Sequence, residues 1–570
     1  ATTVNVSFTK NGYTVTFDAV GGNPVPATQT VKYKEKASAP SPEPTKEGHT
    51  FDGWYNKAGD SLWDFAVNEV TGSTELYAKW RINTYPVTFG TPANGTLKAE
   101  IAGTVIHTTN EVEYGKTVTF TAGPASGYKV DTWTVTPASA LQEGGTAGSA
   151  TAKVKITADI NVNVTFTSLY EPVAFGTNGT GLDTYLKTAA PHTDGIYYIK
   201  VNGLTAENLE GDSYFPPKSS ALGEILKGNP TKKFALKLEE IPYLTDMTAC
   251  FFNCTNLIQV PTIPNGVTKM EDCFESCTSL TQAPVIPNGV TQMRGCFAGC
   301  TSLTHAPEIP GSVTNMRSCF AGCTSLTQAP PVIPNSVTNM SSCFYGCEKL
   351  YHAPVFAASA SVTDMTSCFA GCYSLTQAPP VIPNSVTDMK SCFSGCRSLT
   401  HAPVIPSSVR NMRFCFQNCR SLTQAPVISS GVIDMAVCFG SCKSLTQAPV
   451  IPNSVTNMES CFYDCTSLTQ APVIPSSVKN MQSCFESCTS LTQAPVIPNS
   501  VTNMESCFEN CKNITAVTLK CNYVKDKFDH AFLGCTKLTA GSIKVPVAQL
   551  QTYKDNAWTM RAQEDWFIGE

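Results

Sequence analysis

The motif Cys-Phe-x-x-Cys occurs twelve times between Cys250 and Cys511, at a period of 23 to 25 residues. A sequence that repeats at this period folds into a solenoid, because one repeat cannot bury its apolar side chains until neighbours stack on both sides. The repeat therefore predicts about thirteen stacked turns over residues 250–540. It says less about function, since solenoids are extended surfaces whose exposed positions select the partner.

Composition is consistent with a multidomain exported chain. The 570 residues are too many for one core, so we expect several domains. The net charge is −5, which argues against a nucleic-acid partner because such proteins carry a basic excess. No apolar run is long enough to cross a membrane. The chain starts at Ala1 without a signal-like segment, and we expect that an export signal has been removed.

The first 168 residues have the alternation and the turn residues of two small β domains. Residues 1–82 resemble the Listeria-Bacteroides repeat of bacterial surface proteins. The resemblance rests on Val-Thr-Phe-Asp, Gly-Gly, Pro-Thr-Lys-x-Gly, Thr-Phe-x-Gly-Trp-Tyr and Leu-Tyr-Ala-Lys-Trp at residues 15–18, 21–22, 44–48, 50–55 and 76–80. It implies a β-grasp-like spacer without catalytic residues. Residues 83–168 contain four Thr/Val/aromatic segments and are similar to divergent relatives of the same repeat.

Both ends of the repeat region have the pattern of caps, which a solenoid needs to cover its terminal apolar faces. Within residues 169–249 we predict a strand at 196–201, a helix at 219–227 and a strand at 234–238. Residues 541–570 contain an amphipathic stretch at 547–557 and form the closing cap. The two caps look like those of treponemal surface proteins that are built from leucine-rich repeats.

Within one turn, we predict that Leu, Ala and Val of Leu-Thr-Gln-Ala-Pro-Val point inward from a short parallel strand on the concave side, and that Thr, Gln and Pro point outward. Proline lacks the N–H of a strand ladder, so pairing should be short. Met, Cys, Phe and Cys of Met-x-x-Cys-Phe-x-x-Cys recur at the spacing of one helical face and should complete the core on the convex side.

These turns resemble the BspA-like leucine-rich repeats of bacterial surface proteins. The family string Val-Thr-Asn-Met-x-x-Met-Phe-x-x-Cys-x-Ser-Leu is matched at residues 455–468, with Cys461 where that family usually has Met or Ala. The resemblance implies an exported surface protein of the adhesin type without a catalytic site. The predicted fold is therefore multidomain, with two small β-rich, β-grasp-like modules followed by a capped leucine-rich-repeat solenoid with short parallel strands.

The doubled cysteines allow three chemical interpretations. Zinc sites are disfavoured, because the spacer has three residues and recurs in every turn. Disulfides suit an exported protein, but residues four apart on a helix hold their Cβ atoms farther apart than a disulfide permits. We favour buried thiols that pack as small hydrophobes. Cys521 and Cys535, which break the pattern, are the expected exceptions.

Two sets of exposed residues are candidates for binding. The glutamine after Leu-Thr is replaced by histidine in alternate turns, and histidines two turns apart, about 10 Å, cannot share a metal ion. A basic cluster occupies equivalent positions of consecutive turns and could steer an acidic or sulfated partner. The candidates are Gln282, His305, Gln328, His352, Gln377, His401 and Gln424 in the first set, and Lys390, Arg397, Arg413, Arg420 and Lys443 in the second.

No catalytic motif is present in the sequence, so we expect no enzyme and no cofactor. Our first hypothesis is an extracellular bacterial surface adhesin whose partner is a protein or glycan of host matrix or neighbouring cells. The alternative is a structural protein that self-assembles into an extracellular layer or fibre. A lipid anchor outside this chain stays open.

Overall fold

The computed structural model describes residues 3–214, 216–260 and 262–570. It contains two compact units, the first ending at Leu169 and the second beginning at Tyr170. None of the helices in the described residues is long and apolar enough to span a membrane.

The first β module is one mixed sheet of five strands in the order β2-β1-β5-β3-β4. The strands are β1 (Gly12–Asp18), β2 (Gln29–Lys32), β3 (His49–Asn56), β4 (Ser61–Leu62) and β5 (Thr74–Ile82). The central pair, β1 and β5, is parallel, and the other pairs are antiparallel. Alternate residues of these strands bury Val15, Trp54 and Leu76 in a common core, as the period-2 pattern predicts.

The second β module has two sheets, ordered β12-β13-β10-β7-β8 and β11-β14-β6-β9. The strands are β6 (Thr84–Phe89), β7 (Gly95–Ile101), β8 (Thr104–Ile106), β9 (Asn110–Glu113), β10 (Thr117–Pro124), β11 (Tyr128–Thr136), β12 (Leu141–Gly144), β13 (Thr151–Lys155) and β14 (Ile160–Ser168). The four predicted Thr/Val/aromatic segments fall on β6, β10, β11 and β14. Phe120, from β10, is fully buried at the centre of this core.

A parallel sheet β15-β16-β17-β18 covers the start of the solenoid, with two short helices beside it. Its strands are β15 (Glu171–Ala174), β16 (Ile196–Asn202), β17 (Lys233–Leu238) and β18 (Leu257–Gln259), and the helices are α1 (Thr180–Thr188) and α2 (Ala221–Lys227). The predicted strand, helix and strand are confirmed as β16, α2 and β17, whereas β15 and α1 were not predicted.

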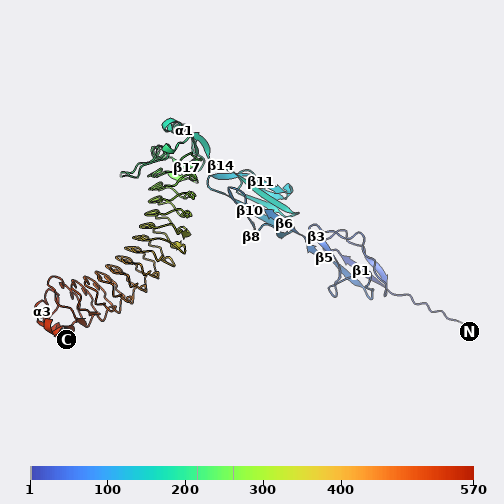
Figure 1. Cartoon of the computed structure of the whole chain (residues 1–570). Helices are drawn as coiled ribbons and strands as arrows, with labels where there is room; N and C mark the ends of the chain where they lie inside the picture. Colours follow the sequence, from blue (N-terminus) through green and yellow to red (C-terminus); the bar gives the residue numbers. More distant parts are fainter. Residues whose placement is uncertain (1–2, 215, 261) are drawn as a thin grey trace. The chain divides into compact units, whose positions relative to one another are not determined.

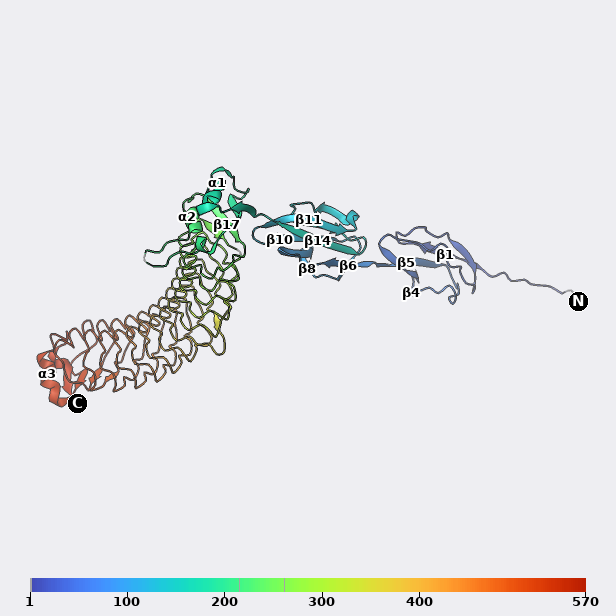
Figure 2. The ribbon, with the colours of Figure 1, turned by 45° about the horizontal axis from the view of Figure 1, so that its top comes forward.

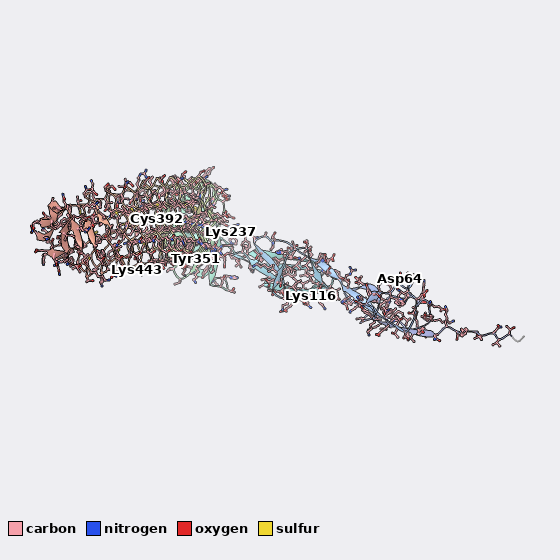
Figure 3. The ribbon with its side chains drawn as sticks, turned by 90° about the horizontal axis from the view of Figure 1, so that it is seen from below. Asp64, Lys116, Lys237, Tyr351, Cys392 and Lys443 are labelled. Atoms are coloured by element: carbon pink, nitrogen blue, oxygen red, sulfur yellow. The ribbon has the colours of Figure 1, made fainter. Side chains whose placement is uncertain are left out.

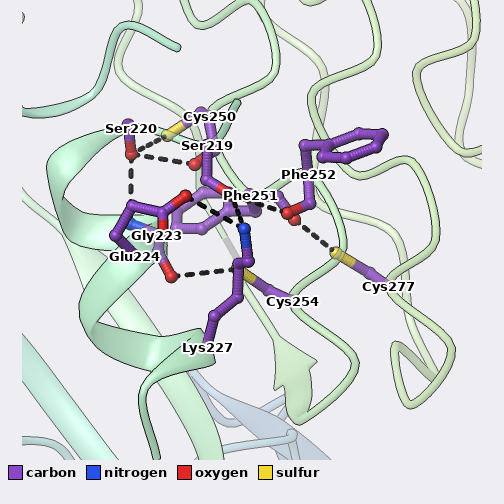
Figure 4. Close-up of polar contacts among 10 residues, drawn as sticks. All are labelled: Ser219, Ser220, Gly223, Glu224, Lys227, Cys250, Phe251, Phe252, Cys254 and Cys277. Carbon is purple, nitrogen blue, oxygen red and sulfur yellow. Dashed lines mark hydrogen bonds and ion pairs between the residues drawn. The ribbon is translucent and has the colours of Figure 1, made fainter. Parts of the chain in front are cut away.

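One serine joins this cap to the first turn. The Ser220 hydroxyl accepts a hydrogen bond from the Gly223 N–H, which caps α2, and donates to the Cys250 carbonyl at 2.8 Å (Figure 4). The carbonyl of the same glycine, Gly223, accepts a hydrogen bond from the Cys254 thiol. Polar bonds as well as apolar packing therefore hold the cap on the repeats.

The turns of the second unit stack one on the next from this cap to α3 (Figures 1 and 2). Their equivalent phenylalanines form one continuous column from Phe251 to Phe532, with neighbouring ring centroids 5.3 to 6.1 Å apart. Every phenylalanine of the Cys-Phe-x-x-Cys motifs is fully buried. Short parallel pairing accompanies the column, for example between β19 (Val332–Ile333) and β20 (Val355–Phe356). Both features confirm the predicted solenoid of leucine-rich repeats.

The Met-x-x-Cys-Phe-x-x-Cys segment does not form the predicted helical turn. It forms two successive β-turns, in which the N–H of each cysteine bonds to a carbonyl three residues earlier, as in Cys484 to Met481 and Cys488 to Phe485. The third residue of each turn has positive φ, such as Ser483 at 50° and Ser487 at 61°. A type II turn requires this conformation. The N–H of Phe485 is then free to bond to the next turn, at the Cys507 carbonyl. The prediction that these residues complete the core is confirmed.

The predicted orientations of proline and valine within Leu-Thr-Gln-Ala-Pro-Val are reversed. In the turn of Leu491, Pro495 is buried and Val496 is 50% exposed. The backbone of Val496 belongs to strand β21 (Val496–Ile497). Strict alternation fails because proline interrupts the ladder between the glutamine and the valine, so the register shifts by one residue. Ile497, rather than valine, fills the core.

The closing cap adds three short strands and a helix. Strands β22 (Val517–Leu519), β23 (Ile543–Val545) and β24 (Phe567–Gly569) extend the parallel sheet from β21. Helix α3 (Leu550–Asp555) lies within the predicted amphipathic stretch and buries Tyr553. The Tyr553 hydroxyl donates to the Cys521 carbonyl at 3.0 Å, which ties the helix to the last turns.

Candidate binding surface

We use the name strand face for the exposed surface of the Thr-Gln/His-Ala-Pro-Val segments between residues 281 and 497. Three parallel rows run along it: exposed glutamines and histidines, half-buried alanines, and exposed valines. Parallel bridges join consecutive members of the first row from His305 to Gln470, so the row is continuous. The predicted candidates Gln282, His305, Gln328, His352, Gln377, His401 and Gln424 all lie in it.

The valine row is the feature that sequence reasoning missed. Its members keep between 46% and 87% of their surface exposed, although valine is a residue that folding normally buries. They are Val285, Val332, Val355, Val381, Val404, Val427, Val450, Val473 and Val496, with Glu308 at the equivalent position of one turn. The signal that could have found them is the second apolar residue that directly follows each valine, which is phenylalanine after Val355 and isoleucine after the others.

Between the outer rows the strand face is hollowed. One hollow of about 480 Å³ spans three turns and is lined by His352, Gln377 and His401 on one side and by Val355 and Val404 on the other. Its floor is formed by the alanines and prolines of the same turns. A second hollow of about 480 Å³ lies around Gln282 and His305, and a third of about 450 Å³ lies around Gln424 and Gln447. All three hollows are lined by the Gln/His row and the alanine row, and we call the surface along these two rows the groove. Valines line only the first hollow, whereas threonines line the second and third.

Each histidine of the row is oriented by the residue that precedes it. Nδ1 of His305 lies 2.9 Å from the Thr304 hydroxyl, and Nδ1 of His401 lies 2.9 Å from the Thr400 hydroxyl. The ring of His352 meets Tyr351 edge to face, with centroids 4.6 Å apart. Because a threonine hydroxyl engages Nδ1, Nε2 is the second hydrogen-bonding atom of the His305 and His401 rings.

The basic cluster lies away from the strand face, on the surface formed by the β-turns, which we call the turn face. Arg413 contacts Asp434 at 3.2 Å and Lys443 contacts Asp464 at 3.0 Å, so these charges are locally balanced (Figure 3 labels Lys443). Arg397 stacks over the Tyr373 ring at 4.4 Å. Backbone bonding of Ser421 to Arg397 places Arg420 in the adjacent turn, and Lys390 is one turn from Arg413. Paired charges attract a distant partner less than free ones do.

A carboxyl pair also lies on the turn face, near the start of the repeats. Burial raises the pKa of Glu275 to about 7, and the neighbouring Asp272 carboxyl adds to the shift. Burial likewise raises the pKa of Asp272, although Arg294, at 2.7 Å, opposes the rise. The pair is isolated from the strand-face rows.

All 26 cysteines are buried free thiols, and within the described residues no group of three or more His, Cys, Asp and Glu side chains could hold a metal ion. From Cys277 onward, the second cysteine of each motif donates its S–H to the phenylalanine carbonyl of the preceding turn, as Cys488 does to Phe462 at 3.1 Å. Burial raises the pKa of the Cys323 thiol to about 12, so it stays protonated.

The expected exception, a disulfide involving Cys521 and Cys535, is wrong. Cys521 lies 3.7 Å from the Tyr553 hydroxyl, and Cys535 donates to the Phe508 carbonyl at 3.0 Å. The two thiols therefore have different partners, because the decayed last motif keeps the stacking of the regular turns.

The stacked turns, short parallel strands and buried phenylalanine column define a leucine-rich-repeat solenoid. Comparison with known families agrees: the BspA type leucine rich repeat region matches residues 247–351, 363–492 and 433–559, more than half of the chain. The chain belongs to the BspA-type leucine-rich-repeat family. The Listeria-Bacteroides repeat domain matches residues 13–79, and the divergent InlB B-repeat domain matches residues 93–169. Each is a repeat family, and none is a family of enzymes.

Individual proteins are similar to parts of this chain. Internalin H of Listeria monocytogenes is 42% identical over 86 residues, which are 15% of this chain and 15% of that protein. The matched segments span 9% to 15% of the length of the curated relatives. A leucine-rich repeat protein from Bacteroides ovatus is 22% identical, with a TM-score of 0.40 over 60% of this chain and 84% of its own. A leucine rich cell surface protein from Faecalibacterium prausnitzii is also 22% identical, with a TM-score of 0.34 over 56% and 80%.

Proposed function

We propose that this chain is a non-enzymatic adhesion protein of the bacterial surface, and that its strand face binds a macromolecule of a host or a neighbouring cell. The observation that carries the proposal is the strand face itself, where the same three rows continue through successive turns without interruption by charge other than Glu308. A surface that repeats in this way offers little at one turn, so affinity must be summed over several turns.

The caps support adhesion over end-to-end assembly. The cap sheet β15-β16-β17-β18 covers the first turn, and β22, β23 and β24 with α3 cover the last. A capped solenoid presents no open stack to another copy, because the apolar ends that would join are already buried. In this proposal the two β modules, which match repeat families, act as spacers.

The test is attachment of the purified chain to matrix proteins and to bacterial cells. Ala378 forms part of the floor of the hollow around His352 and His401. Ala378→Trp should therefore fill this hollow and abolish most saturable attachment. Its control is Glu348→Trp, which adds the same bulk at an exposed position of the turn face. A triple charge reversal at Lys390, Arg397 and Arg420 should change attachment less than Ala378→Trp does.

Two other results would contradict the assignment of the binding surface to the strand face. Loss of attachment in the charge-reversed protein alone would move the binding surface to the turn face. Absence of saturable attachment to any of these surfaces, together with ordered assemblies of the wild-type chain in electron micrographs, would favour the structural role.

A further inference from the structure

The Gln/His row has a period of two turns over six consecutive turns. Histidine and glutamine alternate in this segment, whereas the alanine row on its inner side does not change. The alternating residues are His305, Gln328, His352, Gln377, His401 and Gln424. A partner that takes advantage of this pattern presents one chemical unit to each turn and repeats its chemistry at every second unit.

The spacing of the turns limits which linear polymers can place one unit on each turn. In this segment the phenylalanine centroids lie 5.4 to 5.6 Å apart, and strand spacing is about 4.8 Å. An extended peptide advances by about 3.3 Å per residue, so it falls out of step with the turns when it lies along the groove. A β-1,4-linked hexose chain advances, for each sugar, by a distance that lies between the strand spacing and the phenylalanine spacing. Its successive sugars are turned over, so the same edge recurs at every second sugar.

The side chains of the groove suit such a chain. Imidazoles and amides both donate and accept hydrogen bonds, as sugar hydroxyls do. The alanine floor and the valine row provide an apolar surface for the C–H groups of a sugar ring. Lys, Arg, Asp and Glu are absent from the three rows between Gln328 and Gln424, which gives no preference for a charged or sulfated ligand. The hollow at His352, Gln377 and His401 has a volume of about 480 Å³ and extends over three turns.

We propose that the groove of the strand face binds a linear, uncharged β-1,4-linked glycan lengthwise, one sugar per turn, between His305 and Gln424. The proposal rests on the proposed adhesive function and names its ligand class. Sugars of one orientation meet the imidazoles of His305, His352 and His401, and the intervening sugars meet the amides. The shared chemistry is that of cellulose-type and chitin-type chains, which differ at the substituent on C2.

Titration calorimetry of the full chain with defined oligosaccharides tests this proposal. Cellohexaose and chitohexaose are the probes, and maltohexaose, whose α-linked chain curves, is the control. We expect saturable binding of the β-linked probes and at least tenfold weaker binding of maltohexaose. Affinity should rise as the oligosaccharide lengthens from two to four to six sugars. Binding of only one β-linked probe would support the linkage assignment and identify the C2 substituent.

Variants locate the site. The double variant His352→Ala/His401→Ala should weaken binding at least tenfold, because it removes two imidazoles from one hollow. The matched control Thr301→Ala/Thr324→Ala, directly after the second cysteines of two turns, should bind as the wild type does. Circular dichroism and thermal unfolding of both variants show whether they are folded.

Three results would overturn the glycan proposal: no saturable binding of either β-linked probe, equal binding of maltohexaose, or unchanged binding by the histidine variant. The attachment assay separates this failure from that of the proposed function. If Ala378→Trp still abolishes attachment while the oligosaccharides do not bind, the strand face is adhesive and its ligand is different. Loss of attachment after protease treatment of the target surface would then identify that ligand as a protein.

Discussion

The strand face and the turn face rest on the same core and differ in what their exposed positions do. On the strand face, the same small uncharged side chains recur in turn after turn, with alternation of His and Gln as the main variation. On the turn face, exposed positions vary freely, and several charges are matched locally, such as Arg413 with Asp434 and Lys443 with Asp464. The difference shows that core repetition alone does not dictate surface repetition, and the uniformity of the strand face is the reason for proposing it as the binding surface.

The largest effect expected from this comparison concerns the thiols beneath the turn face. A thiol reagent should modify none of the 26 cysteines in the native protein, because all are buried and burial raises the pKa of groups such as Cys323. After denaturation without reductant, all should react, as intact-mass analysis can count. Unreactive cysteines accompanied by a mass deficit of about two hydrogens per motif would mean that disulfides close the turns.

The next effect separates core from surface within neighbouring turns. Phe462 is fully buried between Phe439 and Phe485, at centroid distances of 5.7 and 5.6 Å. Phe462→Ala should therefore lower the free energy of unfolding by about 3–5 kcal/mol through cavity formation. Gln470→Ala, on the exposed row, should change it by less than about 0.5 kcal/mol. Similar denaturation midpoints for the two variants would contradict the assignment of inward and outward positions.

A smaller effect, in the opposite direction, is expected from one strained residue of the turn face. Val437 has a φ of 57°, which a β-branched residue adopts at a cost, whereas serine occupies the same position in most turns. Val437→Asn should raise the free energy of unfolding by about 1 kcal/mol, since asparagine tolerates this conformation. Ser460→Asn, one turn later, serves as the control and should be nearly neutral. A destabilised Val437→Asn protein would show that packing of the valine outweighs its strain.

The last effect is a pH dependence that belongs to the turn face. Because the pKa of Glu275 is raised to about 7 from an ordinary value of 4.5, its protonated form is favoured by folding. Its stabilising contribution is therefore complete below pH 4.5 and is lost as the pH rises through about 7. Glu275→Gln should be more stable than the wild type at pH 8, and the advantage should shrink toward pH 5 in urea denaturation. Glu509→Gln, at the equivalent repeat position, is the control, and an equal pH dependence in both variants would contradict the assignment.

Sequence periodicity predicted the solenoid, its caps and its core because these depend on residues that recur in every turn. It failed at Pro495 and Val496, where alternation was extended across a proline that breaks the ladder. It also failed at the helical spacing of Cys484 and Cys488, since offsets of three and four suit two stacked β-turns as well as a helix. Positive φ at serine is not visible in the sequence, because the inter-turn bonds impose it.

The candidate site was predicted in part. The Gln/His row was found because its residues are polar and follow a buried leucine. The valine row was assigned to the core, since an apolar side chain in a strand pattern is normally inward. The local partners of Arg413 and Lys443 lie 21 residues away in the sequence and became apparent only when the turns were stacked. Sequence spacing predicts that such residues share one face, but it does not predict whether each charge has an ion-pair partner.

Hydroxyl-radical footprinting of the full chain, free and attached to its target cells, tests most directly which face binds. The account predicts that attachment protects exposed side chains of the strand face, among them His352, Val404 and Val427, while Tyr345 and Tyr463 on the turn face stay reactive. Protection of Tyr345 and Tyr463 with undiminished reactivity of the histidine and valine rows would contradict it.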